Sequence, residues 1–175
     1  MTLELAIRDA EKRKGEWLSE KEHGLNPAEN SGSRYYVTHE HDIVDSYMKD
    51  RMPLHVAAYI REKVPNNGLR SPLELQRQLY ETMISGHPGW QFAGAFMDKG
   101  SSLQLKNRPG LQALLASCGK GEIDVIICRN MSRLHESAGT VLEMVQHLAD
   151  LETPVGVYFE AEETFSLRPE NDATD

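Results

Sequence analysis

From Leu54 onward, short apolar runs alternate with longer segments in which apolar residues recur at helical spacing. Four runs have the length that a buried strand needs: Leu54–Ile60, Phe92–Met97, Ile123–Cys128 and Val155–Phe159. Strands that alternate with helices of about 10–15 residues are typical of a mostly parallel sheet. The pattern therefore predicts an α/β fold with helices on both faces of the sheet.

Local signals place the first helix of this domain. Ser71 suits an N-cap and Pro72 suits the first helical turn, and the breakers at Gly86–Gly89 end the segment. Six positions between them recur at helical spacing: Leu73, Gln76, Leu79, Tyr80, Met83 and Ile84. This spacing predicts a helix between the two signals.

Two further helices follow the later strands. Pro109 opens a helix that ends at Gly119, and Ala138–Leu151 has the apolar spacing of another. The polar segment Asp98–Asn107 is predicted to be a loop.

The first 50 residues differ from the rest of the chain. Residues 1–22 predict an amphipathic helix with four apolar residues near one face: Leu3, Ala6, Ala10 and Trp17. A breaker-rich stretch follows, and Arg34–Asp50 predicts a short strand and then a helix. We expect an N-terminal helical extension over residues 1–50, a domain over 54–165 and a polar tail over 166–175.

The net charge of −8 disfavours a general nucleic-acid binder, since phosphate neutralisation needs clustered Lys and Arg. The acidity lies mainly in the flanks, because residues 54–153 hold 10 basic and 10 acidic residues. A neutral domain of this kind can still gather a local positive site. Two cysteines make no disulfide framework, and Met1–Leu18 is too charged for a secretory signal, so we expect a cytoplasmic protein without a membrane span.

Charged residues stand where a parallel sheet binds ligands. Arg61 closes the first predicted strand, Asp98 closes the second, and Arg133 lies in the loop after the third. Because the carboxyl ends of parallel strands share one edge, we expect these three residues along that edge. Arg108, just before the second predicted helix, adds a third arginine from a separate loop. A planar guanidinium stays protonated and neutralises phosphoryl oxygens, so three of them would form a phosphate clamp. The alternative is that they are surface or ion-pairing residues.

The segments around these arginines resemble the catalytic domain of the resolvase/invertase serine recombinases. The similarity lies in the order and spacing of Tyr59–Lys63, Asp98–Ser102, Arg108–Gln112 and Arg133-Leu134, and it runs from about Leu54 to Phe165. The resemblance implies a resolvase-like fold. It also implies that Arg61, Arg108 and Arg133 are retained catalytic positions that contact DNA phosphate. Gln76 resembles another phosphate-contacting position of the family, and Lys63 would join it as a point charge.

The chain departs from the family at the positions that carry its chemistry. The family's Tyr-x-Arg-x-Ser motif supplies a serine nucleophile, and that position is Lys63 here. Lysine does not form the phosphoserine ester that holds a broken strand; it either holds a phosphate or pairs with a carboxylate. Three residues after Arg133, where the family has a second arginine, stands Glu136, and His135 and Leu103 replace family glycines. These changes indicate an inactive site.

Other candidate chemistry is weaker. Four hydroxyls are predicted near the same edge: Ser71, Ser101, Ser102 and Ser132. Any of them would have to act as a displaced nucleophile. The run from His39 to Asp42 contains metal-ligand types without a distant partner, so we expect no metal and no other cofactor.

We therefore expect a non-catalytic relative of serine recombinases that acts as a binding or regulatory module. Its partners would be DNA, through weak phosphate contacts, and an active recombinase or a second copy of itself. The alternatives are an active DNA-cleaving recombinase with a displaced nucleophile, and a mobile-element remnant without a role. No helix-turn-helix pattern follows the domain, so we expect no element that reads bases.

Overall fold

A computed structural model describes residues 41–62, 72–100 and 104–167 of the chain. The predicted extension helix over 1–22, the linker after it and the polar tail from residue 168 lie outside the described residues. Lys63, Ser71, Ser101, Ser102 and Leu103 also lie outside them.

Four strands run parallel and build the predicted sheet: β1 (Leu54–Glu62), β2 (Trp90–Lys99), β3 (Val125–Cys128) and β4 (Gly156–Phe159). A short fifth strand, β5 (Thr164–Phe165), pairs antiparallel with β4, and the order across the sheet is β2-β1-β3-β4-β5. β1, β3 and β4 are buried over nearly their whole length, which explains why they appear as continuous apolar runs in the sequence.

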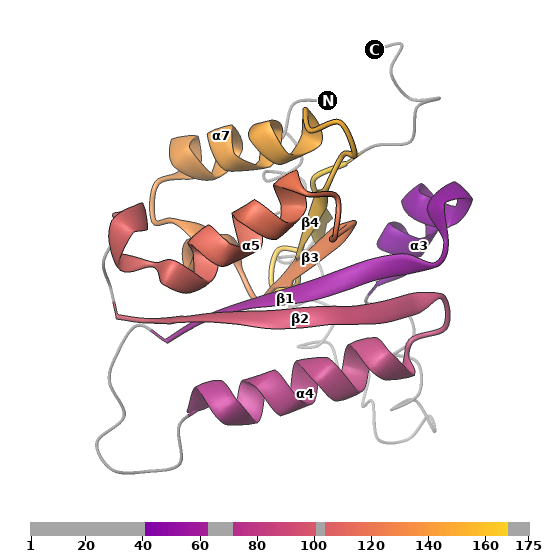
Figure 1. Ribbon diagram of the computed structural model, residues 1–175, viewed down its shortest axis with the longest axis horizontal. Helices are drawn as coiled ribbons and strands as arrows, with labels where there is room; N and C mark the ends of the chain where they lie inside the picture. Colours follow the sequence, from indigo (N-terminus) through magenta and orange to yellow (C-terminus); the bar gives the residue numbers. More distant parts are fainter. Residues whose placement is uncertain (1–40, 63–71, 101–103, 168–175) are drawn as a thin grey trace, which may run out of the picture.

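Helices cover both faces of the sheet, as predicted (Figure 1). α4 (Pro72–Gly86) lies on one face together with α3 (Asp42–Met48), and α5 (Pro109–Gly119) and α7 (Ala138–Ala149) lie on the other. Three short helices complete the described elements: the 3-10 helices η1 (Lys49–Arg51) and η2 (Leu105–Asn107), and α6 (Met131–Leu134). The α/β prediction with a mostly parallel sheet is confirmed.

The region before Leu54 contributes to the domain core. Val44 and Met48 of α3 are buried in the same apolar cluster as α4. Asp45 accepts hydrogen bonds from the indole Nε1 of Trp90 at 2.8 Å and lies 2.6 Å from Nε2 of His87. The helix predicted within Arg34–Asp50 is therefore present, and it is bound to the sheet through the segment that follows α4.

Two details differ from the sequence prediction. β2 continues through Asp98 and Lys99, which were predicted to begin a polar loop, and Asp98 is buried because its carboxylate finds hydrogen-bond partners inside the domain. η2, α6 and β5 were not predicted, since each is too short to show a period.

No helix in the described part of the chain is long and apolar enough to cross a membrane.

Candidate functional site

Arg61 and Arg133 meet at the carboxyl edge of the sheet. Arg61 is the penultimate residue of β1 and is paired in register with Asp98 of β2. Arg133 lies on α6, which follows β3 after a two-residue connection. Nη1 of Arg133 donates to the backbone oxygen of Arg61 at 2.9 Å. The predicted convergence of these residues is therefore present in the fold.

The guanidinium of Arg61 is buried but only partly hydrogen-bonded. Arg61 is 2% exposed, and its Nη2 donates to the backbone oxygen of Ser132. Its Nε and Nη1 have no hydrogen-bond partner among the described residues. Burial, with a further contribution from the charge of Arg108, lowers the pKa of Arg61 below its usual range. A buried cation with two open donors is unfavourable by itself and favours a nearby anion.

Glu136 supplies negative charge at this position. Its Oε1 lies 4.0 Å from Nη2 of Arg61, and its side chain is 54% exposed while that of Arg61 is 1% exposed. Glu136, which the sequence analysis singled out as a departure from the family pattern, thus pairs with Arg61. Because the carboxylate is largely solvated, this ion pair with Arg61 is weak.

Arg108 has a different environment although it is equally buried. Its Nε and Nη2 donate to Oη of Tyr59 at 3.2 and 2.8 Å. Nη2 also donates to the backbone oxygen of Arg133 at 2.7 Å, and Nη1 donates to that of Leu134. These bonds hold α6 against the end of β1. Arg108 is therefore engaged in positioning the backbone, with its donors directed into the protein.

Asp98 links the same network to the start of α5. Its Oδ1 accepts from the amide of Gly110 at 2.7 Å, and its Oδ2 accepts from the amide of Leu111 at 2.8 Å. Oη of Tyr59 donates to Oδ2 at 2.8 Å. The carboxylate thus satisfies two of the unpaired amides at a helix N-terminus, where negative charge is stabilised.

The Arg-Pro-Gly-Leu segment has a direct structural explanation. A Cβ at Gly110 would lie 2.3 Å from the backbone oxygen of Met97, so only glycine permits α5 to approach β2 this closely. Pro109 occupies the first helical turn, and Leu111 is buried in the core. Tyr59, which the sequence analysis did not assign to the site, connects Arg108 and Asp98. Its place two residues before Arg61, on the same face of β1, was the available signal.

The hydroxyl of Ser132 is hydrogen-bonded to the N-cap residue of α6. Asn130 is the N-cap, and its Oδ1 accepts from the amide of Arg133 at 3.2 Å and from Oγ of Ser132 at 2.7 Å. Sγ of Cys128 donates to the backbone oxygen of Asn130 at 3.2 Å, and burial raises the pKa of this thiol to about 12. Both nucleophile-type groups described at this edge therefore stabilise the turn after β3.

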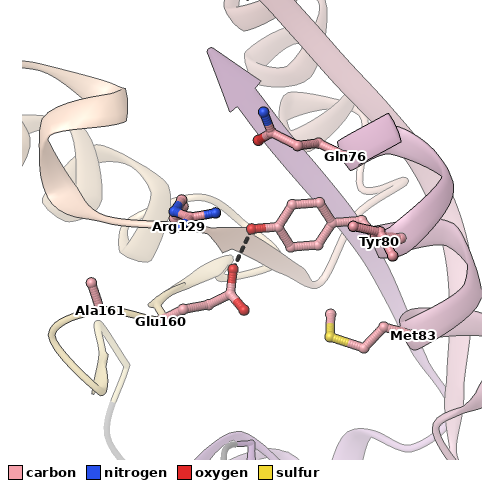
Figure 2. A pocket seen from close by; sticks show the side chains of 7 residues that line it. Gln76, Tyr80, Met83, Arg129, Glu160 and Ala161 are labelled. Carbon is pink, nitrogen blue, oxygen red and sulfur yellow. Dashed lines mark hydrogen bonds between the residues drawn. The ribbon is translucent and has the colours of Figure 1, made fainter. Parts of the chain in front are cut away.

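Gln76 does not join the arginines. It lies on α4, on the other face of the sheet, and lines a separate pocket with Tyr80, Arg129 and Glu160 (Figure 2). Oη of Tyr80 donates to Oε1 of Glu160, and burial together with the charge of Glu160 raises the pKa of Tyr80 above its usual range. The sequence analysis did not predict this pocket, since its lining residues come from three separate segments.

The residues of the possible metal motif divide at the boundary of the described chain. His41 is buried, and its ring lies 5.2 Å from the rings of Trp90 and Tyr158. Burial, with a further effect of His87, lowers the pKa of His41 to about 4. Asp42 is exposed at the first position of α3. Within the described ranges, no three histidine, cysteine or acidic side chains gather as metal ligands.

Comparisons with known proteins identify the family of this chain. A family model described as "Resolvase, N terminal domain" matches residues 56–172, more than half of the chain. Among solved structures, the chain is similar to the N-terminal catalytic domain of TP901-1 integrase. The identity is 21%, the TM-score is 0.48, and the match covers 64% of this chain and 81% of that one. A search of curated proteins found no match. The chain belongs to the resolvase N-terminal domain family, the serine recombinase domain related to site-specific DNA recombination.

Proposed function

We propose that this chain is a non-catalytic serine recombinase domain that acts as a binding or regulatory module. It associates with an active recombinase or with a second copy of itself, and it retains a weak phosphate site at the carboxyl edge of the sheet. Arg61 and Arg133 form this site, with Lys63 as an additional charge and Arg108 as the residue that fixes its backbone.

The ion pair between Arg61 and Glu136 is the observation that carries this proposal. A phosphodiester at Arg61 would have to approach the carboxylate that already lies 4.0 Å from its guanidinium. Negative charge at this position disfavours a phosphate ligand and opposes the charge that develops during phosphoryl transfer. The two open donors of Arg61 still favour an anion, so the site combines residual affinity with an intramolecular competitor.

The nucleophile positions support the same conclusion. Covalent catalysis by a recombinase requires a hydroxyl that attacks phosphorus and later leaves. The family's serine position is Lys63. Oγ of Ser132 donates to Oδ1 of Asn130, the N-cap of α6, and its use as a nucleophile would break this hydrogen bond.

A covalent-adduct assay tests the loss of chemistry. The native protein and its Arg61→Ala variant are incubated with a labelled DNA duplex, denatured and separated by electrophoresis. We expect no covalent protein–DNA species from either protein. An adduct that forms with the native chain and disappears in Arg61→Ala would show an active recombinase with a displaced nucleophile, and would overturn the proposal.

A recombination assay tests the regulatory role. The native protein is added to an active serine recombinase and its substrate, with Arg133→Ala and Lys120→Ala as variants that each remove one positive charge. We expect the native chain and Lys120→Ala, which is exposed on the opposite end of α5, to change the recombination rate. If the protein does not change the recombination rate and does not self-associate in analytical ultracentrifugation, the proposed binding or regulatory role is contradicted. A mobile-element remnant without a role is then favoured.

A further inference from the structure

A pocket of about 390 Å³ lies beyond the carboxyl ends of β3 and β4, on the α4 side of the sheet. Leu79, Tyr80 and Met83 of α4 form its apolar side. Arg129 and Glu160 follow β3 and β4 directly, and they are neighbours because Cys128 and Phe159 pair in register. Its volume is in the range of pockets that hold a large side chain or a small ligand.

The rim of this pocket exposes apolar surface. Leu75 is 59% exposed and Leu79 is 62% exposed, and they lie one turn apart on α4. In the described part of the chain, the only other large hydrophobic residue with comparable exposure is Leu105, on η2. Two adjacent leucines beside a hollow form a continuous apolar face of the kind that receives an amphipathic helix.

The pocket also contains an unpaired cation. Arg129 is exposed, and within the described residues no carboxylate or carbonyl oxygen forms an ion pair or hydrogen bond with its guanidinium. Figure 2 shows this side chain directed toward the phenol of Tyr80, across the pocket from α4. A guanidinium next to apolar walls favours an aromatic ring, by a cation–π contact, and a nearby acidic group.

The chain itself contains a segment with this chemistry. The stretch from Leu3 to Leu18, outside the described residues, carries the apolar positions Leu3, Ala6, Ala10 and Trp17 at helical spacing. Within this stretch Glu16 lies next to Trp17, and Glu4, Asp9 and Glu11 supply further carboxylates. This stretch therefore offers an aromatic anchor, an apolar face and acidic groups.

The connection permits this segment to reach the pocket. His41, the first described residue, packs against Trp90 and His87, which follow the C-terminal end of α4. Between Leu18 and His41 lie 22 residues, and a chain of that length spans up to about 70 Å. The 15 residues of α4 extend only about 22 Å.

We propose that the segment from Leu3 to Leu18 docks in cis as an amphipathic helix on the apolar face of α4, with Trp17 anchored in the pocket. Trp17 packs against Leu79 and Met83 and lies next to the guanidinium of Arg129. The pocket lies on the α4 side of the sheet and shares no lining residue with the site of Arg61 and Arg133.

Hydrogen exchange of the full-length chain at short labelling times, detected by mass spectrometry, tests the docking. A single helix of about 16 residues is marginal in water, so protection of its amides requires a partner surface. We expect at least tenfold protection within residues 3–18 in the native protein. Leu79→Asp and Trp17→Ala should abolish it, and Leu105→Asp, an exposed leucine away from the pocket, should retain it.

Exchange in β1 and β3 serves as the check that each variant is folded. Unprotected amides in residues 3–18 of the native protein would overturn the proposal, as would protection that Leu79→Asp leaves unchanged. Protection that decreases on dilution would also overturn it, because the occupant would then be a second copy of the chain.

Discussion

Arg61 and Arg108 are both 2% exposed, but the regions around them satisfy a buried guanidinium in different ways. The region of Arg108 surrounds it with a phenol oxygen and two backbone oxygens. The region of Arg61 gives it one backbone oxygen, leaves two nitrogens open and places a solvated carboxylate nearby. Burial alone therefore does not identify a binding residue. Donors left open at an edge of the fold indicate a ligand site, whereas satisfied donors indicate structure.

Removing the satisfied arginine should have the largest effect. Arg108→Leu leaves the backbone oxygens of Arg133 and Leu134 without their donor inside the domain. We expect a loss of about 3–5 kcal/mol in the free energy of unfolding, because buried polar groups lose a charged partner. Urea denaturation measures the loss, and Arg77→Leu, at a half-buried arginine of α4 that pairs with the solvated carboxylates of Glu74 and Glu81, should change stability little. Similar stability of both variants would contradict the structural role of Arg108.

His41 extends the comparison to a buried group that can lose its charge. The pKa of His41 is lowered to about 4 from 6.5, so the unfolded chain binds more protons than the folded one between these values. Stability from this residue is therefore fully present above pH 6.5 and is lost as the pH falls toward 4, by about 3 kcal/mol. Urea midpoints from pH 7 to 4 should fall more steeply for the native protein than for His41→Phe. Parallel pH profiles would show that His41 is not buried in its neutral form.

Gly110 tests whether α5 must approach β2 for Asp98 and Arg108 to be in place. Gly110→Ala puts a Cβ against the backbone oxygen of Met97, and we expect a loss of about 1–3 kcal/mol from overpacking. Gly119→Ala, in the same helix, meets no atom within 4 Å and is the matched control. Thermal unfolding of the two variants measures the difference. Equal melting temperatures would mean that the close approach is not required.

The smallest effect on stability should come from Glu136, the carboxylate that pairs with Arg61. Glu136→Gln removes the carboxylate from a solvated ion pair, so we expect a change of less than about 0.5 kcal/mol. The same change should increase the affinity for inorganic phosphate several-fold, because the competing charge is absent. Chemical-shift perturbation of the Arg61 side chain by phosphate measures this. Unchanged affinity would separate Glu136 from the anion site.

The sequence was sufficient to predict the sheet and the positions of Arg61 and Arg133. Strands such as Ile123–Cys128 are buried on both faces and therefore stand out as apolar runs, and the carboxyl ends of parallel strands share an edge. The partners of Arg108 could not be predicted in this way, because its acceptors are a side chain 49 residues earlier and backbone oxygens about 25 residues later. Gln76 was assigned from the family resemblance, and its helix lies on the other face of the sheet, beside a separate pocket. Hydrogen-bond saturation is a tertiary property that spacing along the chain does not contain.

Binding of a fluorescent DNA duplex across a salt series, compared for the native protein, Glu136→Gln and Arg133→Ala, tests whether a phosphate site survives at Arg61 and Arg133. We expect weak binding that falls with salt, strengthens in Glu136→Gln and weakens in Arg133→Ala, because phosphate competes with Glu136 for Arg61. Absence of binding by all three proteins at low salt would contradict a surviving phosphate site. Equal binding by all three would contradict the role of Glu136 as its intramolecular competitor.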